Sequence, residues 1–77
     1  MKLIIINGPN LNLLGEREPE IYGSETLEQV NEWIENHELC KNLELEFFQS
    51  NSEGELIDFL HSKRKSVDYC ILNAGAL

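Results

Sequence analysis

The chain has 77 residues, 42% of them hydrophobic, and this length allows one domain or a part of one. The hydrophobic content argues against intrinsic disorder, and no window reaches the roughly 18 apolar residues of a membrane-spanning helix. Acidic residues outnumber basic ones, 14 to 6, and the formal charge of -8 argues against nucleic acid and anionic membranes as partners.

The two cysteines, Cys40 and Cys70, do not have the spacing of a CxxC or metal-binding motif. The N-terminal segment MKLIIIN contains too short an apolar run for a signal peptide and lacks a small-residue cleavage site. We therefore expect reduced, unpaired thiols, no metal site and a cytoplasmic protein.

Residues 2–7, KLIIIN, form a continuous apolar and β-branched run, which predicts a strand that is covered on both faces. After a long connection, Thr26 and Gln29 have the spacing of a capping box and predict the start of a helix. The apolar face of this helix is predicted by residues at helical spacing: Leu27, Val30, Trp33 and Ile34. The helix is expected to end near His37.

The second half of the chain begins with residues 43–48, LELEFF, which predict a second strand nearer the edge of a sheet. Two overlapping capping boxes, Ser50 to Glu53 and Ser52 to Glu55, are alternative starts of a second helix. Its inner face is predicted to consist of Leu56, Ile57, Phe59 and Leu60. The cations of residues 61–65 suit a solvated helix C-terminus, and residues 67–73 predict a third strand.

The expected order strand-helix-strand-helix-strand predicts an α/β protein with a parallel three-stranded sheet and right-handed crossovers. Ligands of such sheets bind beyond the carboxyl ends of the strands. Three segments are expected to reach that edge: residues 7–22, 49–52 and 73–77. Because this arrangement leaves much apolar surface uncovered, we expect the rest of the domain to lie outside these 77 residues.

The connection between the first strand and the first helix is longer than such a turn needs. Gly15 and Gly23 bracket a segment that suits a lid, and this segment contains Arg17 and Tyr22. A cation near a tyrosine stabilises the phenolate and lowers its pKa, so this pair could act as a base and its activator. A packing tyrosine and a solvated arginine are the alternative interpretation.

Asn10 and Asn12 in the same connection could position a substrate or stabilise an enolate, although asparagines beside glycine also form turns. The connection is not a dinucleotide fingerprint, because it lacks GxGxxG and because Pro9 removes a backbone N–H. It is not a Walker loop either, since no Gly-Lys-Ser/Thr follows.

Three blocks of the sequence resemble type II 3-dehydroquinate dehydratase, or type II dehydroquinase: NGPNLNLLGEREPEIYGSETL, FFQSNSEGELIDFLH and ILNAGAL. The resemblance implies a flavodoxin-like fold, in which a five-stranded parallel sheet has helices on both faces. Residues 1–77 would be the N-terminal part of one such catalytic domain, with its first three strands and two helices. It also implies a homo-oligomer, a dodecamer built from trimers.

The resemblance implies a hydro-lyase that converts 3-dehydroquinate to 3-dehydroshikimate by anti elimination through an enolate. This reaction belongs to the shikimate pathway of aromatic amino acid biosynthesis and needs no metal or organic cofactor. The implied partner is therefore the small-molecule substrate.

The resemblance also implies roles for four residues of this chain. Tyr22 would be the base that removes a proton from C2 of the substrate, and Arg17 would keep Tyr22 anionic. Asn10 would orient the enolate-forming carbonyl, through water, and Asn73 would bind substrate hydroxyl groups.

The general acid of the family is a histidine further along the chain, and this sequence does not contain it. His37 and His61 fall in the two predicted helices, where surface or packing roles are expected. Two alternatives stay open: an inactive half-domain that needs a complementary chain or an oligomer, and a flavodoxin-like module that binds a nucleotide or flavin.

Overall fold

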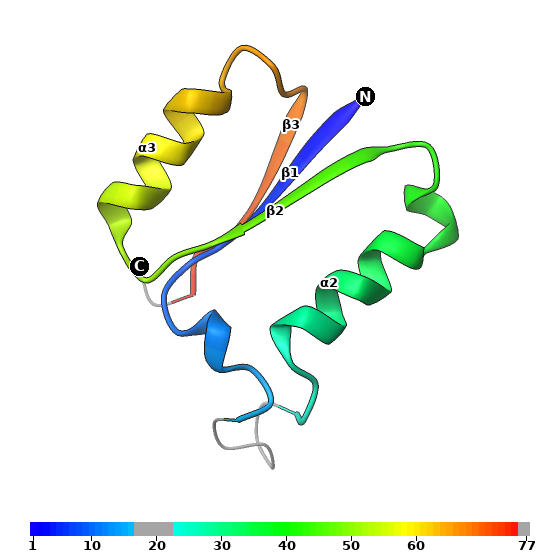
Figure 1. The fold of residues 1–77 in the computed structure, drawn as a ribbon, viewed down its shortest axis with the longest axis vertical. Coiled ribbons are helices and arrows are strands. Elements are labelled where there is room, and N and C mark those ends of the chain that lie inside the picture. The colour runs from blue at the N-terminus through cyan, green and yellow to red at the C-terminus, as the bar shows by residue number, and fades with distance from the viewer. Residues whose placement is uncertain (17–22, 76–77) are drawn as a thin grey trace.

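The structure is a computed structural model that describes residues 1–16 and 23–75 (Figure 1). Its helices and strands are, in chain order, β1 (Lys2–Asn7), α2 (Leu27–Asn36), β2 (Glu44–Gln49), α3 (Glu53–Lys63) and β3 (Tyr69–Asn73). Two short 3₁₀ helices, η1 (Leu11–Leu13) and η2 (Glu38–Cys40), precede and follow α2. The predicted order of strands and helices is confirmed.

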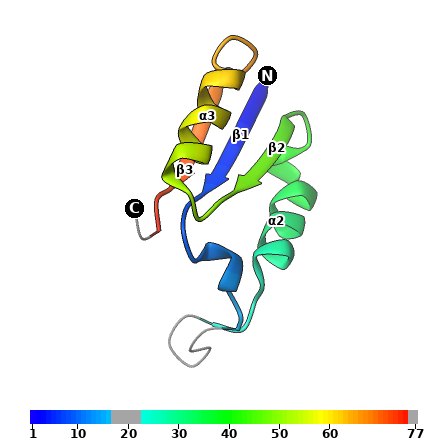
Figure 2. The same cartoon turned by 60° about the vertical axis from the view of Figure 1, so that its left-hand side comes forward.

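The three strands form one parallel sheet in the order β2-β1-β3. Asn7, the last residue of β1, is level with Gln49 of β2 and Asn73 of β3, so the three carboxyl ends share one edge. Figures 1 and 2 show α2 on one face of the sheet and α3 on the other. This layering confirms the predicted parallel α/β sheet with helices on both faces, and the edge position of the second strand.

The hydrophobic core lies between the sheet and α3. Its fully buried members are Ile4, Ile6 and Leu56, and the partly buried residues packed against them are Phe48, Phe59, Leu60 and Val67. The rings of Phe48 and Phe59 stack with centroids 4.1 Å apart. Burying one isoleucine or leucine side chain contributes about 1.5–3 kcal/mol, so these contacts hold α3 against β1 and β2.

Both helices begin at side-chain caps. Thr26 Oγ1 accepts a hydrogen bond from the Gln29 N–H (3.2 Å), and Gln29 Oε1 accepts one from the Thr26 N–H (2.8 Å), which completes the predicted capping box. For α3, Ser52 Oγ accepts from the Glu55 N–H (3.3 Å). The alternative start at Ser50 is wrong, because Ser50 Oγ instead donates to the Glu55 carboxylate (2.7 Å).

Two residues predicted on the inner faces of the helices are exposed. Trp33 of α2 is 67% exposed and Ile57 of α3 is 44% exposed. Each lies one position from an inward residue, Ile34 or Leu56, and one position rotates a helix by about 100°. The Trp33 ring packs against the imidazole of His37, with centroids 5.0 Å apart, instead of against the sheet.

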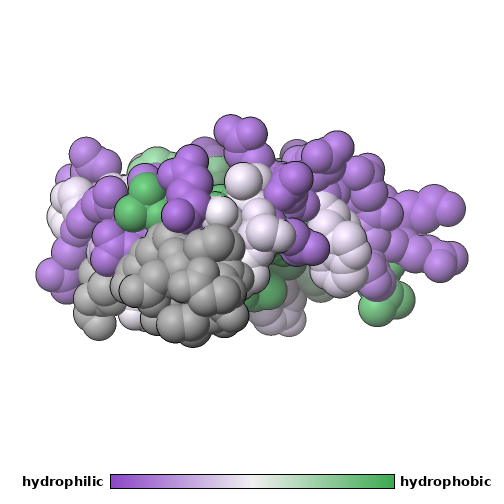
Figure 3. Space-filling view, turned by 90° about the horizontal axis from the view of Figure 1, so that it is seen from below, coloured by the Kyte–Doolittle hydropathy of each residue, from purple (hydrophilic) through white to green (hydrophobic). Residues whose placement is uncertain are grey.

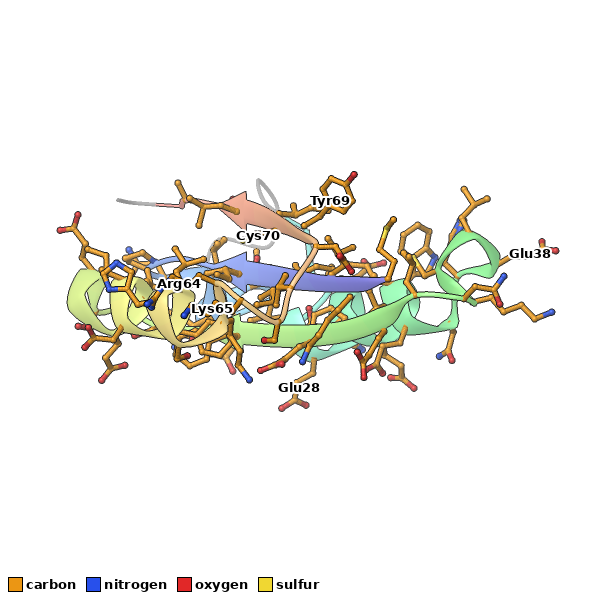
Figure 4. The ribbon with its side chains drawn as sticks, turned by 90° about the horizontal axis from the view of Figure 1, so that it is seen from above. Glu28, Glu38, Arg64, Lys65, Tyr69 and Cys70 are labelled. Atoms are coloured by element: carbon orange, nitrogen blue, oxygen red, sulfur yellow. The ribbon has the colours of Figure 1, made fainter. Side chains whose placement is uncertain are left out.

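The third strand begins at Tyr69, two residues later than predicted. Val67 packs onto the core, and Asp68 closes the connection to β1: its carboxylate accepts from the Lys2 N–H (2.8 Å), and its own N–H donates to the Lys2 carbonyl (3.0 Å). All five residues of β3 are exposed. Figure 4 shows the Tyr69 side chain projecting from β3, away from the other two strands.

A three-residue ion-pair network ties β1, β2 and α3 together. The Glu46 carboxylate lies 3.2 Å from Lys2 Nζ and 3.1 Å from Lys63 Nζ. Hydrogen bonds from Lys63 and then from Lys2 lower the pKa of the Glu46 carboxyl below its ordinary value. All three side chains keep contact with water, so each pair contributes at most about 1 kcal/mol.

Candidate active site

The carboxyl edge of the sheet brings together the three segments that the sequence predicted there. Beyond the strand ends, the Gly8 N–H donates to the Asn73 carbonyl (2.9 Å), and the Ser50 N–H donates to the Asn7 carbonyl (3.2 Å). The backbone therefore remains paired for one residue past β1 and β2. Within the described residues, the edge is built from residues 7–16, 49–52 and 73–75.

Gly8 allows the first and third segments to approach closely. A Cβ atom at this position would lie 2.2 Å from the carbonyl oxygen of Ala74, well inside van der Waals contact. Only glycine fits without moving one backbone segment away from the other. This contact holds the start of the loop against the residues that follow β3.

Asn10 stands at this edge in a left-handed backbone conformation, with φ of 70°. Asparagine adopts this conformation more readily than most residues. Its N–H donates to Asn51 Oδ1 (2.9 Å), and its side chain makes no capping hydrogen bond to η1. The carboxamide of this exposed residue is therefore not used to start the short helix.

Asn73 is the last residue of β3, and its backbone pairing with Gly8 puts it beside the segment that leads to Asn10. The structure thus brings two of the four predicted site residues to one edge. The other two, Arg17 and Tyr22, lie outside the described residues. Gly15 and Gly23 both have positive φ, 83° and 88°, but their predicted role as hinges of a lid stays a prediction.

A cavity of about 390 Å³ lies beside the edge, between the loop, the start of α2 and the end of β2. It is lined by Asn12, Leu14, Glu16, Thr26, Leu27, Glu28 and Gln49. This volume suits a small organic molecule. Seen from this end, the surface around the loop is mainly hydrophilic (Figure 3). Two of its lining side chains, Glu16 and Glu28, are carboxylates, and neither Asn10 nor Asn73 lines it, so the cavity lies beside these two predicted site residues rather than around them.

Comparison of the chain with models of protein families shows the family to which it belongs. The family model described as Dehydroquinase class II matches residues 1–77. The chain belongs to this family.

Relatives and solved structures of class II dehydroquinases cover almost the whole chain. The 3-dehydroquinate dehydratase of Halothermothrix orenii is 49% identical over 76 residues, and that of Prochlorococcus marinus strain SARG is 54% identical over 76 residues. Each alignment covers 99% of this chain and 51% of the relative. The chain therefore spans about half the length of the curated relatives it matches.

The crystal structure of type II dehydroquinase from Butyrivibrio crossotus matches 99% of this chain and 53% of its own, with a TM-score of 0.90 and 44% identity. That of type II dehydroquinase from Propionibacterium acnes matches with a TM-score of 0.82 and 29% identity, over 94% of this chain and 50% of its own. These matches confirm both the resemblance drawn from the three sequence blocks and the flavodoxin-like arrangement of the strands.

The two histidines of this chain lie away from the carboxyl edge, at the C-terminal ends of the helices. His37 caps α2, and its Nδ1 accepts from the Leu39 N–H (3.1 Å). His61 is exposed in the last turn of α3, where its carbonyl accepts from the Arg64 guanidinium (2.8 Å). Their predicted position away from the carboxyl edge is confirmed, and so is the cationic end of α3.

The described residues were also searched for metal-binding groups, membrane-spanning helices and disulfides. In residues 1–16 and 23–75, no group of three His, Cys, Asp or Glu side chains could hold a metal ion. No helix in this part of the chain is long and apolar enough to cross a membrane. Cys40 and Cys70 are free thiols; Cys70 is exposed, and partial desolvation by neighbouring atoms raises the pKa of its thiol.

Two residues of the edge, Gln49 and Asn51, were missed by the sequence reasoning. Gln49 Nε2 donates to the Gly8 carbonyl (3.3 Å) and to Asn51 Oδ1 (3.1 Å), so both side chains contact the loop that follows β1. The available signal was their place in residues 49–52, a segment that was predicted to reach this edge. The pattern of that segment indicated only the start of a helix.

Proposed function

We propose that this chain is the N-terminal part of a single flavodoxin-like catalytic domain of a 3-dehydroquinate dehydratase. Such an enzyme is a hydro-lyase that converts 3-dehydroquinate to 3-dehydroshikimate, in the shikimate pathway of aromatic amino acid biosynthesis. The observation that carries this proposal is the family match over residues 1–77. The amide-rich carboxyl edge described above supports it.

Tyr22 begins the proposed reaction as a phenolate. It takes a proton from C2 of the substrate, and the electron pair of the C–H bond moves to the neighbouring carbonyl to form an enolate. Arg17 keeps Tyr22 anionic at neutral pH, because a cation nearby lowers the pKa of a phenol. Asn10 stabilises the enolate oxygen, through water, as preorganised amide donors do.

The enolate then collapses to the ketone while the carbon–oxygen bond on the adjacent carbon breaks. The leaving hydroxide takes a proton from a general acid and departs as water, and a conjugated double bond remains. By the family resemblance the general acid is a histidine further along the polypeptide, and His37 and His61, at the C-terminal ends of α2 and α3, do not replace it. Asn73 binds substrate hydroxyl groups during both steps, and no metal or organic cofactor takes part.

We propose further that the protein works in the cytoplasm and assembles as a homo-oligomer, a dodecamer. The free thiols Cys40 and Cys70 suit a reducing compartment. Exposed apolar side chains on β3, among them Ile71 and Leu72, support association with further polypeptide. Light scattering after size-exclusion chromatography measures the assembly, and a monomer at micromolar concentration would contradict the dodecamer.

The activity is tested on the complete polypeptide as the cell makes it. Turnover of 3-dehydroquinate yields a conjugated enone, which is followed by its ultraviolet absorbance. Tyr22→Phe should lower kcat by at least about a thousandfold while substrate affinity changes little, because only the proton acceptor is lost. The matched control is Tyr69→Phe, which makes the same change at the start of β3, at the end of the sheet away from the carboxyl edge, and should retain full activity. An inactive wild-type protein, or a fully active Tyr22→Phe variant, would refute the assignment.

A further inference from the structure

The side chains of Gln49 and Asn51 form a clamp on the loop that follows β1. Asn51 Oδ1 accepts two hydrogen bonds, from the Asn10 N–H (2.9 Å) and from Gln49 Nε2 (3.1 Å). Gln49 Nε2 also donates to the Gly8 carbonyl (3.3 Å). These bonds join two segments that lie 41 residues apart in the chain.

Hydrogen bonds of Ser50 fix the backbone between Gln49 and Asn51. Ser50 is buried between the two clamp residues, its N–H donates to the Asn7 carbonyl (3.2 Å), and its Oγ donates to the Glu55 carboxylate (2.7 Å). Its Oγ also accepts from the Ser52 N–H (3.0 Å). The backbone that presents Gln49 and Asn51 is therefore fixed both to β1 and to the first turn of α3.

The hydrogen bond from the loop to Asn51 is made by Asn10, whose backbone is left-handed. Asn10 is the single residue other than glycine with positive φ among residues 1–16 and 23–75. Such a conformation persists where the surroundings over-determine it. The bond from Asn51 falls on the N–H of Asn10 itself, and the bond from Gln49 turns the Asn51 oxygen toward that N–H.

We propose that Asn51 is a positioning residue that holds the Asn10 backbone in its left-handed conformation and so aims the Asn10 carboxamide at the reacting carbonyl. Gln49 orients Asn51 and thereby acts one step further from the substrate. This inference rests on the proposed dehydratase function. It adds a structural cause for the geometry of a residue on which the enolate depends.

The first test compares two substitutions of similar size in the complete polypeptide. Asn51→Leu removes the acceptor, whereas Asn51→Asp keeps an oxygen that accepts from both Asn10 and Gln49. We expect Asn51→Leu to lower kcat by about ten- to a hundredfold with a smaller change in KM, because a misplaced catalytic group costs mainly turnover. Asn51→Asp should keep kcat within about threefold of the wild-type value.

The second readout is independent of activity. Hydrogen exchange by NMR should find the Asn10 N–H protected in the wild type and in Asn51→Asp, and at least about tenfold less protected in Asn51→Leu. The Leu56 N–H, which donates to the Ser52 carbonyl within α3, reports whether each variant is folded. If Asn51→Leu loses this protection as well, Asn51→Ala replaces it.

The outcomes separate the inference from the proposed function. An unchanged kcat in a folded variant without the acceptor overturns the positioning role, and so does unchanged protection of the Asn10 N–H. A wild-type protein without turnover of 3-dehydroquinate overturns the proposed function, and the positioning role falls with it. Loss of kcat and of Asn10 protection in Asn51→Leu, both rescued in Asn51→Asp, supports the inference.

Discussion

Strands β1 and β3 are paired neighbours of similar apolar composition, yet their burial differs sharply. Ile6 of β1 is 0% exposed, while Leu72, its register partner on β3, is 51% exposed. Ile71 of β3 is 53% exposed. Within these 77 residues, β1 has a neighbouring strand on each side and a helix on each face of the sheet, whereas β3 has a neighbouring strand on one side only. An apolar run therefore predicts a strand, but the segments that pack against the strand decide how much of it is buried: β2 also has one neighbouring strand, yet Phe48 packs against Phe59 of α3.

The largest effect on the free energy of unfolding is expected from substitutions of the register partners Ile6 and Leu72. In the 77-residue chain, Ile6→Ala should lower the free energy of unfolding by about 3 kcal/mol, because it leaves a cavity in a packed core. Leu72→Ala should lower it by less than about 1 kcal/mol, because half of that side chain already contacts water. Urea unfolding followed by circular dichroism measures both values.

Equal losses for the two substitutions would contradict the difference in burial. A larger loss for Leu72→Ala in a longer polypeptide or in an oligomer would reveal that β3 is covered there. The two variants therefore test the difference in burial between Ile6 and Leu72, and they show whether further polypeptide covers β3.

The contact between the continuations of the two strands should give the next largest effect. Gly8→Ala places a methyl group 2.2 Å from the Ala74 carbonyl oxygen and should cost about 2 kcal/mol of stability. Gly54→Ala is the matched control, since the nearest atom to its added Cβ is 3.8 Å away in the first turn of α3. It should be neutral or stabilise by up to about 1 kcal/mol. Thermal unfolding of both variants measures the difference, and equal effects would argue against a tight approach at Gly8.

The smallest effect on stability is expected from β2, at the other edge of the sheet, where Glu46 forms ion pairs with Lys2 and Lys63. The lysine partners lower the pKa of Glu46 in the folded state, so its carboxylate stabilises the protein above the ordinary value of 4.5. This contribution is lost as the pH falls through the lower pKa of the folded state. Glu46→Gln should therefore cost about 0.5–1 kcal/mol at pH 7 and progressively less in acid.

Glu44→Gln is the control for this experiment, because it makes the same charge change at an exposed position of β2. Urea unfolding from pH 7 down to pH 3 measures both variants against the wild type. A cost of Glu46→Gln that stays constant over this range would show that the ion pairs do not stabilise the fold.

The positions of two candidate site residues were predictable from the sequence, whereas Arg17 and Tyr22 lie outside the described residues. Asn10 and Asn73 follow or end apolar strands, and parallel strands put their carboxyl ends at one edge. The contacts of Gln49 and Asn51 were not predicted, because their partners, Gly8 and Asn10, are distant in the sequence. An amide side chain bonds equally well to any nearby backbone group, so its partner is known only once the segments meet.

The sequence by itself determined the features that depend on near neighbours in the chain. The strand Lys2–Asn7 and the capping box of Thr26 and Gln29 need only a few consecutive residues, because hydrogen bonds and rotamers act over short distances. Only the tertiary structure decided that Trp33 faces water, that β3 of these 77 residues is exposed and that Asn51 Oδ1 accepts from the Asn10 N–H. Each of these depends on which segments pack together, and packing is a property of the sheet order rather than of any local pattern.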